Sequence, residues 1–202
     1  KQRISIYLDG KFAFGLAAIL ATKLKTGQKL SESDVQRLRS LDEVEAAYER
    51  ALNYLSFRPR SQQEMERYLR DKSVGDEARA QVLERLKNSE LVNDESFAQF
   101  WVSNREVFAP RSKMALRQEL RQKGLASDVV SGALEQVDEN ASAYEAGGKR
   151  AARMAGLDEA TFKRRLSGFL ARRGFGYAVV KTTVNRLWQE LRGESSLEES
   201  ET

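Results

Sequence analysis

The chain contains no cysteine and no histidine among its 202 residues. Without cysteine it has neither disulfide bonds nor a thiolate metal site. Without histidine it lacks the commonest general base in enzymes. No GxxxxGK[ST] phosphate-binding loop occurs either. These absences argue against catalysis, and the sequence predicts no catalytic residue, no metal site and no cofactor.

Long apolar runs are also missing. None approaches the roughly 20 residues that a membrane-spanning helix needs, and no signal-peptide pattern is visible. Hydrophobic residues make up 41% of the chain and charged residues 32%, which is typical of a helix-rich protein with a modest core. We therefore expect a cytoplasmic protein with no membrane partner.

The net charge of +4 is unevenly distributed along the chain. Residues 141–192 hold 11 basic and 4 acidic side chains, a net charge of +7, whereas residues 193–202 carry −4. A basic block indicates a polyanionic partner, usually nucleic acid. The alternative is a solvated helical face.

The first residues favour a β-hairpin. Apolar and polar residues alternate in ISIYL and again in KFAFGL, on either side of Asp9-Gly10. Asp-Gly suits a two-residue turn with positive φ. Ser31 and Asp34 then predict the start of a short helix. A lone hairpin is marginally stable, so residues 1–41 should pack on the helices that follow.

The rest of the chain is repetitive. PRSQQEMERYLRDKSV (59–74) and PRSKMALRQELRQKGL (110–125) match at a constant offset of 51 residues. A third copy is fainter: LARRGF (170–175) repeats LRQKGL (120–125) at an offset of 50, and Gly174 matches Gly124. In each copy apolar residues fall at three- and four-residue steps, which indicates amphipathic helices.

Three copies with a period near 50 residues predict a mainly α fold, a tandem array of three three-helix repeats behind the hairpin extension. The expected repeats are residues 42–93, 94–140 and 141–192, and the acidic tail 193–202 is expected to be disordered. Such arrays are elongated and curved, and they offer a long surface to a long partner.

Three segments carry a resemblance to a known family. YLSFRPRSQQEMERYL (54–69), LVNDESFAQFWVSNR (91–105) and RQELRQKGL (117–125) resemble the bacterial RecX family, regulators of the RecA recombinase. The resemblance covers residues 45–191. The third repeat departs most, since it lacks Pro-Arg-Ser and contains an added AGGKRAARMAGL segment (146–157).

The resemblance implies a non-enzymatic protein of recombination and DNA repair. RecX proteins are associated with the helical groove of the RecA filament on single-stranded DNA, where they restrain strand exchange and ATP turnover, and they bind DNA by themselves. A monomer is expected. The alternative is an independent helical regulator that binds duplex DNA in a sequence-specific way.

The candidate contacts to RecA, single-stranded DNA or duplex DNA are basic side chains of the repeats and one tyrosine beside a glycine. At the Pro-Arg-Ser corners the structural interpretation is favoured, because proline ends one helix and serine caps the next. The candidates are Arg58, Arg60, Arg111, Lys113, Arg117, Arg121, Lys123, Lys163, Arg164, Arg165, Arg172, Arg173, Tyr177 and Lys181.

Overall fold

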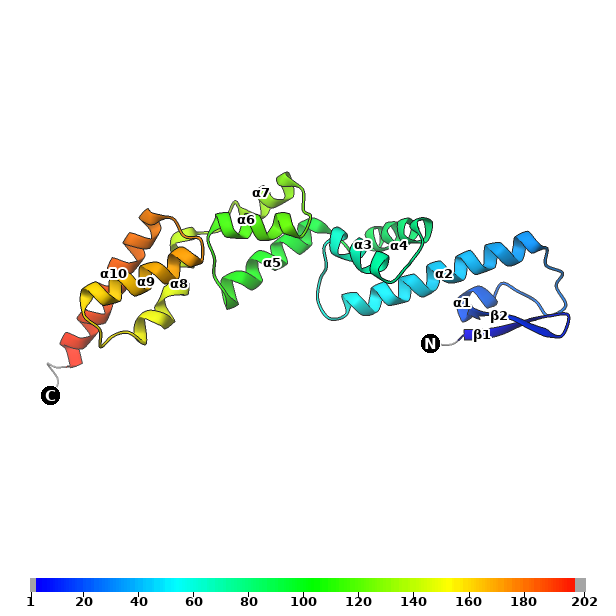
Figure 1. Cartoon of the computed structure of the whole chain (residues 1–202), viewed down its shortest axis with the longest axis horizontal. Helices are drawn as coiled ribbons and strands as arrows, with labels where there is room; N and C mark the ends of the chain where they lie inside the picture. The colour runs from blue at the N-terminus through cyan, green and yellow to red at the C-terminus, as the bar shows by residue number, and fades with distance from the viewer. Residues whose placement is uncertain (1–2, 199–202) are drawn as a thin grey trace. The chain divides into compact units, whose positions relative to one another are not determined.

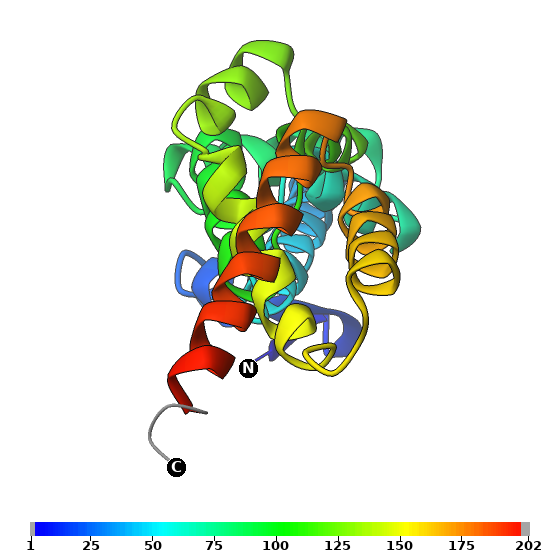
Figure 2. The same ribbon diagram turned by 90° about the vertical axis from the view of Figure 1, so that its left-hand side faces the viewer.

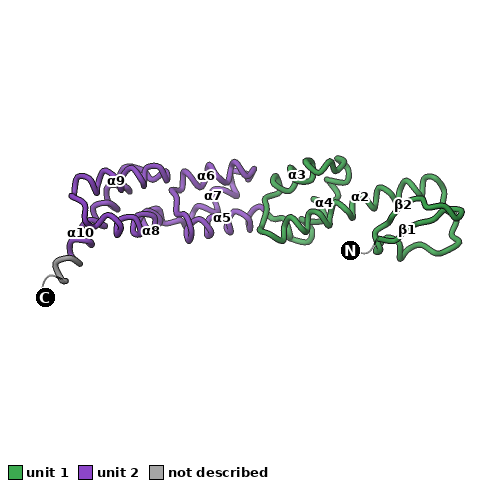
Figure 3. The backbone as a smooth tube through the Cα atoms, turned by 60° about the horizontal axis from the view of Figure 1, so that its bottom comes forward, with its two compact units in different colours: residues 1–93 green, residues 94–202 purple. Residues whose placement is uncertain are grey.

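The computed structural model describes the backbone of residues 3–198 and the side chains of residues 3–193 (Figure 1). Contacts between residues divide the chain into two compact units, residues 1–93 and residues 94–202 (Figure 3). Within the described residues no helix is both long enough and apolar enough to cross a membrane.

The first unit begins with the predicted hairpin. Strand β1 (Arg3–Leu8) pairs antiparallel with β2 (Lys11–Ala17). Asp9 (φ 48°) and Gly10 (φ 78°) form the turn between them, as a two-residue turn with positive φ requires. A short helix, α1 (Ala18–Ala21), follows.

The hairpin packs on the long helix α2 (Glu32–Leu55), as expected. The Ala17 N–H donates to Asp42 Oδ1 (2.8 Å), and Arg3 Nη2 donates to Asp42 Oδ2 (2.6 Å). Leu16 of β2 is fully buried. Asp42 therefore holds the hairpin to the helix by accepting from both strands.

The predicted helix start at Ser31 is confirmed, but its predicted length is wrong. Ser31 and Asp34 form a reciprocal capping box. The helix then continues for 24 residues to Leu55, so the expected boundary between residues 41 and 42 lies inside one helix. No proline or glycine interrupts residues 31–55, and nothing in the local sequence ends the helix.

Module one is formed by the second half of α2 with α3 (Gln62–Asp71) and α4 (Asp76–Asn88). Its core contains Ala47, Met65, Leu69, Val82 and Leu86, all fully buried. These apolar residues lie on the stripes that the sequence predicts. Each helix exposes its other faces, so the helices are stable only together.

Modules two and three make up the second unit. Module two consists of α5 (Asp94–Phe108), α6 (Lys113–Gln122) and α7 (Ser127–Leu134). Module three consists of α8 (Glu139–Ala152), α9 (Glu159–Arg172) and α10 (Tyr177–Glu198). The added segment 146–157 forms the second half of α8 and the connection to α9. Helix α9 accordingly starts earlier in its repeat than α6 does.

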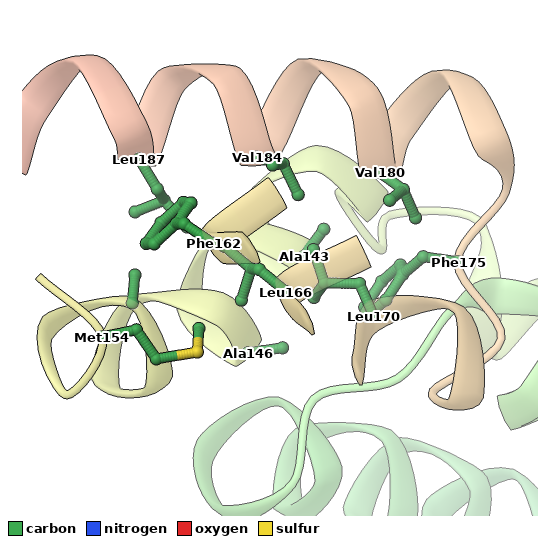
Figure 4. Close-up of a cluster of buried hydrophobic side chains, with 11 residues drawn as sticks. Ala143, Ala146, Met154, Phe162, Leu166, Leu170, Phe175, Val180, Val184 and Leu187 are labelled. Atoms are coloured by element: carbon green, nitrogen blue, oxygen red, sulfur yellow. The ribbon is translucent and has the colours of Figure 1, made fainter. Parts of the chain in front are cut away.

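Module three has the largest of the three apolar cores. Helix α10 lies along α8 and α9, as two views show (Figures 1 and 2). Leu187 points from α10 toward Phe162, and Val180 points toward Phe175 and Leu170 at the other end of the same core (Figure 4). The acidic tail, residues 193–202, differs in part from the prediction of disorder. Helix α10 continues to Glu198, and residues 199–202 lie outside the described residues.

The turn after the second helix has the same backbone conformation in all three modules. Gly124 (φ 84°) and Gly174 (φ 91°) adopt the left-handed conformation that the sequence predicts. Ser73, the equivalent residue of module one, has φ 56°. A side chain in this region costs about 1–2 kcal/mol, so module one carries a strain that the other modules avoid.

We expect Ser73→Gly to raise the free energy of unfolding of the first unit by about 0.5–1 kcal/mol. Relief of the left-handed strain is partly offset by the larger backbone entropy of glycine in the unfolded chain. Urea unfolding followed by far-UV circular dichroism measures the change. The matched control is Ser56→Gly, since Ser56 (φ −62°) is right-handed and its replacement should lower stability. A Ser73→Gly variant less stable than wild type would contradict the prediction.

Candidate nucleic-acid interface

The Pro-Arg-Ser corners build helix starts. Ser61 Oγ accepts from the Glu64 N–H at the start of α3, and Ser112 Oγ accepts from the Ala115 N–H at the start of α6, both at 3.1 Å. Both serines are fully buried. The serine of each motif therefore acts as a helix N-cap, a role worth about 1 kcal/mol.

The arginines of the first corner are held within module one. Arg58 donates to both carboxylate oxygens of Glu64, each at 2.9 Å. These hydrogen bonds raise the pKa of Arg58 above its usual value. The Arg60 guanidinium lies 3.8 Å from the ring centroid of Tyr54, which is stacked on Tyr68. Bidentate pairing and ring stacking are contacts that arginine makes well.

Module two holds the equivalent arginine with a carboxylate. At the offset of 51 residues, Arg111 corresponds to Arg60, and Glu119 corresponds to Tyr68. Arg111 Nε lies 3.1 Å from Glu119 Oε1, and Glu119 Oε2 accepts from Trp101 Nε1 and Arg105 Nε, both at 2.8 Å. The arginine at this corner is therefore held by an aromatic ring in module one and by a carboxylate in module two. This favours a structural role for Arg58, Arg60 and Arg111.

Two of the four candidates near α6 also have partners. Lys113 Nζ donates to the Glu135 carbonyl at 3.3 Å, and the Lys123 ammonium lies 4.8 Å from the Trp101 ring centroid. Arg117 and Arg121 instead line a shallow hollow on α6 and make no bond to another described side chain. Only these two remain available to an external anion on this helix.

Two candidates in module three have partners of their own. Lys163 pairs with Glu159 at 2.6 Å. Arg173 donates to the Pro110 carbonyl at 2.9 Å and lies 4.7 Å from the Phe169 ring centroid. Burial lowers the pKa of Arg173, and Arg111 contributes further. Arg173 therefore joins module three to module two, which sequence reasoning did not foresee.

The remaining candidates of module three are exposed. Helix α9 buries Phe162, Leu166 and Leu170 on one face and presents cations on the other. These exposed residues make no bond or ring contact with any other residue of the described part of the chain. They are Arg164, Arg165 and Arg172 on α9, and Tyr177 and Lys181 on α10.

A cleft at the junction of modules two and three adds Lys149, Arg150 and Arg153, which belong to the basic block of residues 141–192, to the candidates named above. Its volume is about 280 Å³. The end of α5, one face of α8 and the end of α9 line it with Phe108, Lys149, Arg150, Arg153, Phe169 and Arg173. The charge excess of residues 141–192 indicated the cations, but the sequence did not indicate that Phe108 at the end of α5 lines the same cleft.

Comparison with family models matches each module in chain order. The matching models describe the first three-helix domain of RecX over residues 47–86, the second over residues 93–134 and the third over residues 138–184. Together they cover more than half of the chain, and each falls on one of the modules described above.

Individual relatives agree with these matches. Regulatory protein RecX of Bacillus subtilis is 31% identical over 194 residues, which cover 94% of this chain and 74% of that protein. Its namesake from Amycolatopsis mediterranei is 36% identical over 154 residues, 75% of this chain and 88% of the relative. A crystal structure of regulatory protein RecX, 26% identical, superposes with a TM-score of 0.71 over 91% of this chain and 93% of that one. With its three domains matched in order, the chain belongs to the RecX family of regulatory proteins.

Proposed function

We propose that this RecX-family chain regulates the RecA recombinase by binding the RecA filament on single-stranded DNA and restraining it. Family membership supports the regulatory role. The observation that carries the contact to DNA is the set of unpaired cations on the outer face of α9, Arg164, Arg165 and Arg172. Exposed arginines without intramolecular partners are the groups that neutralise phosphates.

Regulation of this kind needs no chemistry on the part of the regulator. A ligand that binds one state of a filament better than another shifts the population toward that state. The relatives are named regulatory proteins, and we propose that binding is the whole activity. We further propose a monomer that acts in the cytoplasm, where the RecA filament forms. The elongation and curvature expected of the array stay predictions.

The proposal predicts that the triple variant Arg164→Glu, Arg165→Glu, Arg172→Glu loses most of its effect on RecA. Three charge reversals on one face turn phosphate attraction into repulsion, so the concentration for half-inhibition should rise at least about tenfold. The measurement is the single-strand-dependent ATP turnover of RecA from the same organism, titrated with each protein. Arg173 stays unchanged, because it bonds to Pro110 and its loss would disturb the fold.

The matched control reverses three exposed cations in module one, Arg67, Arg70 and Lys87. The control has the same net charge as the test variant. A general loss of electrostatic attraction to the DNA would therefore affect both variants equally. Wild-type protein that fails to inhibit RecA at low salt would overturn the proposal. Tight, sequence-dependent binding to duplex DNA in that case would favour the independent duplex-binding regulator instead.

A further inference from the structure

We propose that the cleft between modules two and three holds one nucleotide of single-stranded DNA, with its base on the Phe108 ring and its phosphate among the α8 cations. The inference rests on the proposed function and assigns the strand a place on the molecule. The cleft volume of about 280 Å³ lies just below the roughly 300–1,000 Å³ of small-ligand sites. It therefore suits one unit of an extended chain.

The charges of the cleft favour an anion. Lys149 and Arg153 are exposed and have no bonding partner among the described residues. Arg150 and Arg173 add two more cations, and the carboxylates Glu106 and Glu145 also line the cleft. Four cations against two carboxylates leave an excess of positive charge. Since Lys149 and Arg150 lie on α8 and Arg153 is its C-cap, an anion is drawn toward that wall.

Phe169 orients two of the cations. The guanidinium of Arg150 lies 5.3 Å from its ring centroid and that of Arg173 lies 4.7 Å from it. A guanidinium stacked on a ring uses its flat face and keeps the N–H groups of its edge for hydrogen bonds. Arg173 already donates one of its N–H groups to the Pro110 carbonyl. Arg150 is therefore the better donor to a phosphate.

Phe108 supplies the surface for a base. Its side chain is 78% exposed at the end of α5, and it is not part of the module two core. An exposed ring beside a cluster of cations matches a nucleotide, which carries a flat base and a phosphate on the same unit. A duplex keeps its bases stacked inside, so it cannot offer one to the ring. An acidic peptide would satisfy the cations but gives the ring no regular partner.

The test is the affinity of the full chain for a fluorescent single-stranded thymidine oligonucleotide, measured by anisotropy without RecA. Phe108→Ala should raise the Kd about tenfold, in the lower part of the range for base–aromatic stacking. With an oligonucleotide of the same length made of abasic sites, Phe108→Ala should change nothing. The double variant Lys149→Glu, Arg153→Glu should weaken binding to both oligonucleotides and reduce the salt dependence.

Phe57→Ala is the matched control. Phe57 occupies the position of Phe108 in module one and is 83% exposed, but it does not line this cleft, so its loss should leave affinity unchanged. Equal affinities of wild type and Phe108→Ala for the thymidine strand would overturn the inference while leaving inhibition of RecA intact. Weaker inhibition of RecA with unchanged strand affinity would also overturn it, since the cleft would then bind protein. Failure of the proposed function would instead appear as wild-type protein without effect on RecA.

Discussion

Phe162→Ala is expected to lower the free energy of unfolding of the second unit by about 3–5 kcal/mol. The Phe162 side chain is fully buried in the module three core (Figure 4). Its ring centroid lies 5.0 Å from that of Trp188. Alanine would remove the ring and leave a cavity, because α8, α9 and α10 meet around it. A loss of this size approaches half of the 5–15 kcal/mol that stabilises a typical domain.

Urea unfolding followed by tryptophan fluorescence measures this loss. Both tryptophans, Trp101 and Trp188, lie in residues 94–202, so their emission reports the second unit. Far-UV circular dichroism provides a second probe, because the substitution lies beside Trp188. Phe108→Ala serves as the control, since it removes an exposed ring from the same unit and should cost less than about 0.5 kcal/mol. Similar losses for the two variants would contradict the described core.

Gly174→Ala is expected to cost about 2–4 kcal/mol in the same experiment. Gly174 has φ 91°, a conformation that costs other residues about 1–2 kcal/mol. A Cβ there would lie 2.5 Å from Ser112 Oγ and 3.0 Å from the Ala115 Cβ. Ser112 is fully buried and caps α6, so it cannot turn aside without losing that bond. Overpacking of this kind adds about 1–3 kcal/mol.

A double-mutant cycle separates the steric overlap from the backbone strain. Ser112→Ala removes the oxygen that the new Cβ would meet and itself costs about 1 kcal/mol as a lost cap. The double variant should therefore be more stable than the sum of the single effects by about 1 kcal/mol. Additive effects, within 0.5 kcal/mol, would mean that the module two–module three junction is looser than described. Since the cleft spans this junction, Gly174→Ala should also weaken binding of the thymidine strand.

Local features of the structure were predictable from local sequence. The Asp9-Gly10 turn, the caps at Ser31, Ser61 and Ser112, and the left-handed glycines each depend on a few neighbouring residues. The buried stripes followed from three- and four-residue spacing, because every module buries one face of each helix. The length of α2 was mispredicted because a change of pattern at residue 42 looks like a boundary although nothing there ends a helix.

The candidate site was less predictable, because charge along the chain does not say which charges are already used. Fourteen residues were singled out, and Arg58, Arg111, Lys163 and Arg173 all turn out to have hydrogen-bond or ion-pair partners. Arg172 and Arg173 are neighbours in sequence, yet one is exposed and the other joins two modules. Their difference depends on Pro110, which lies 63 residues before Arg173.

The amino-acid sequence by itself determined the repeats, the helical class, the excess of cations in residues 141–192 and the likeness to RecX. Periodicity and charge can be read from the sequence because they do not depend on which residues meet in the folded chain. Contacts between distant segments decided the rest. The contact between α9 and module two brings Arg173 to the Pro110 carbonyl, and Phe108 lines the same cleft as the α8 cations. Burial of the opposite face of α9 in the module three core leaves Arg164, Arg165 and Arg172 exposed. A side chain is available to a partner only where the folded chain offers it no better contact.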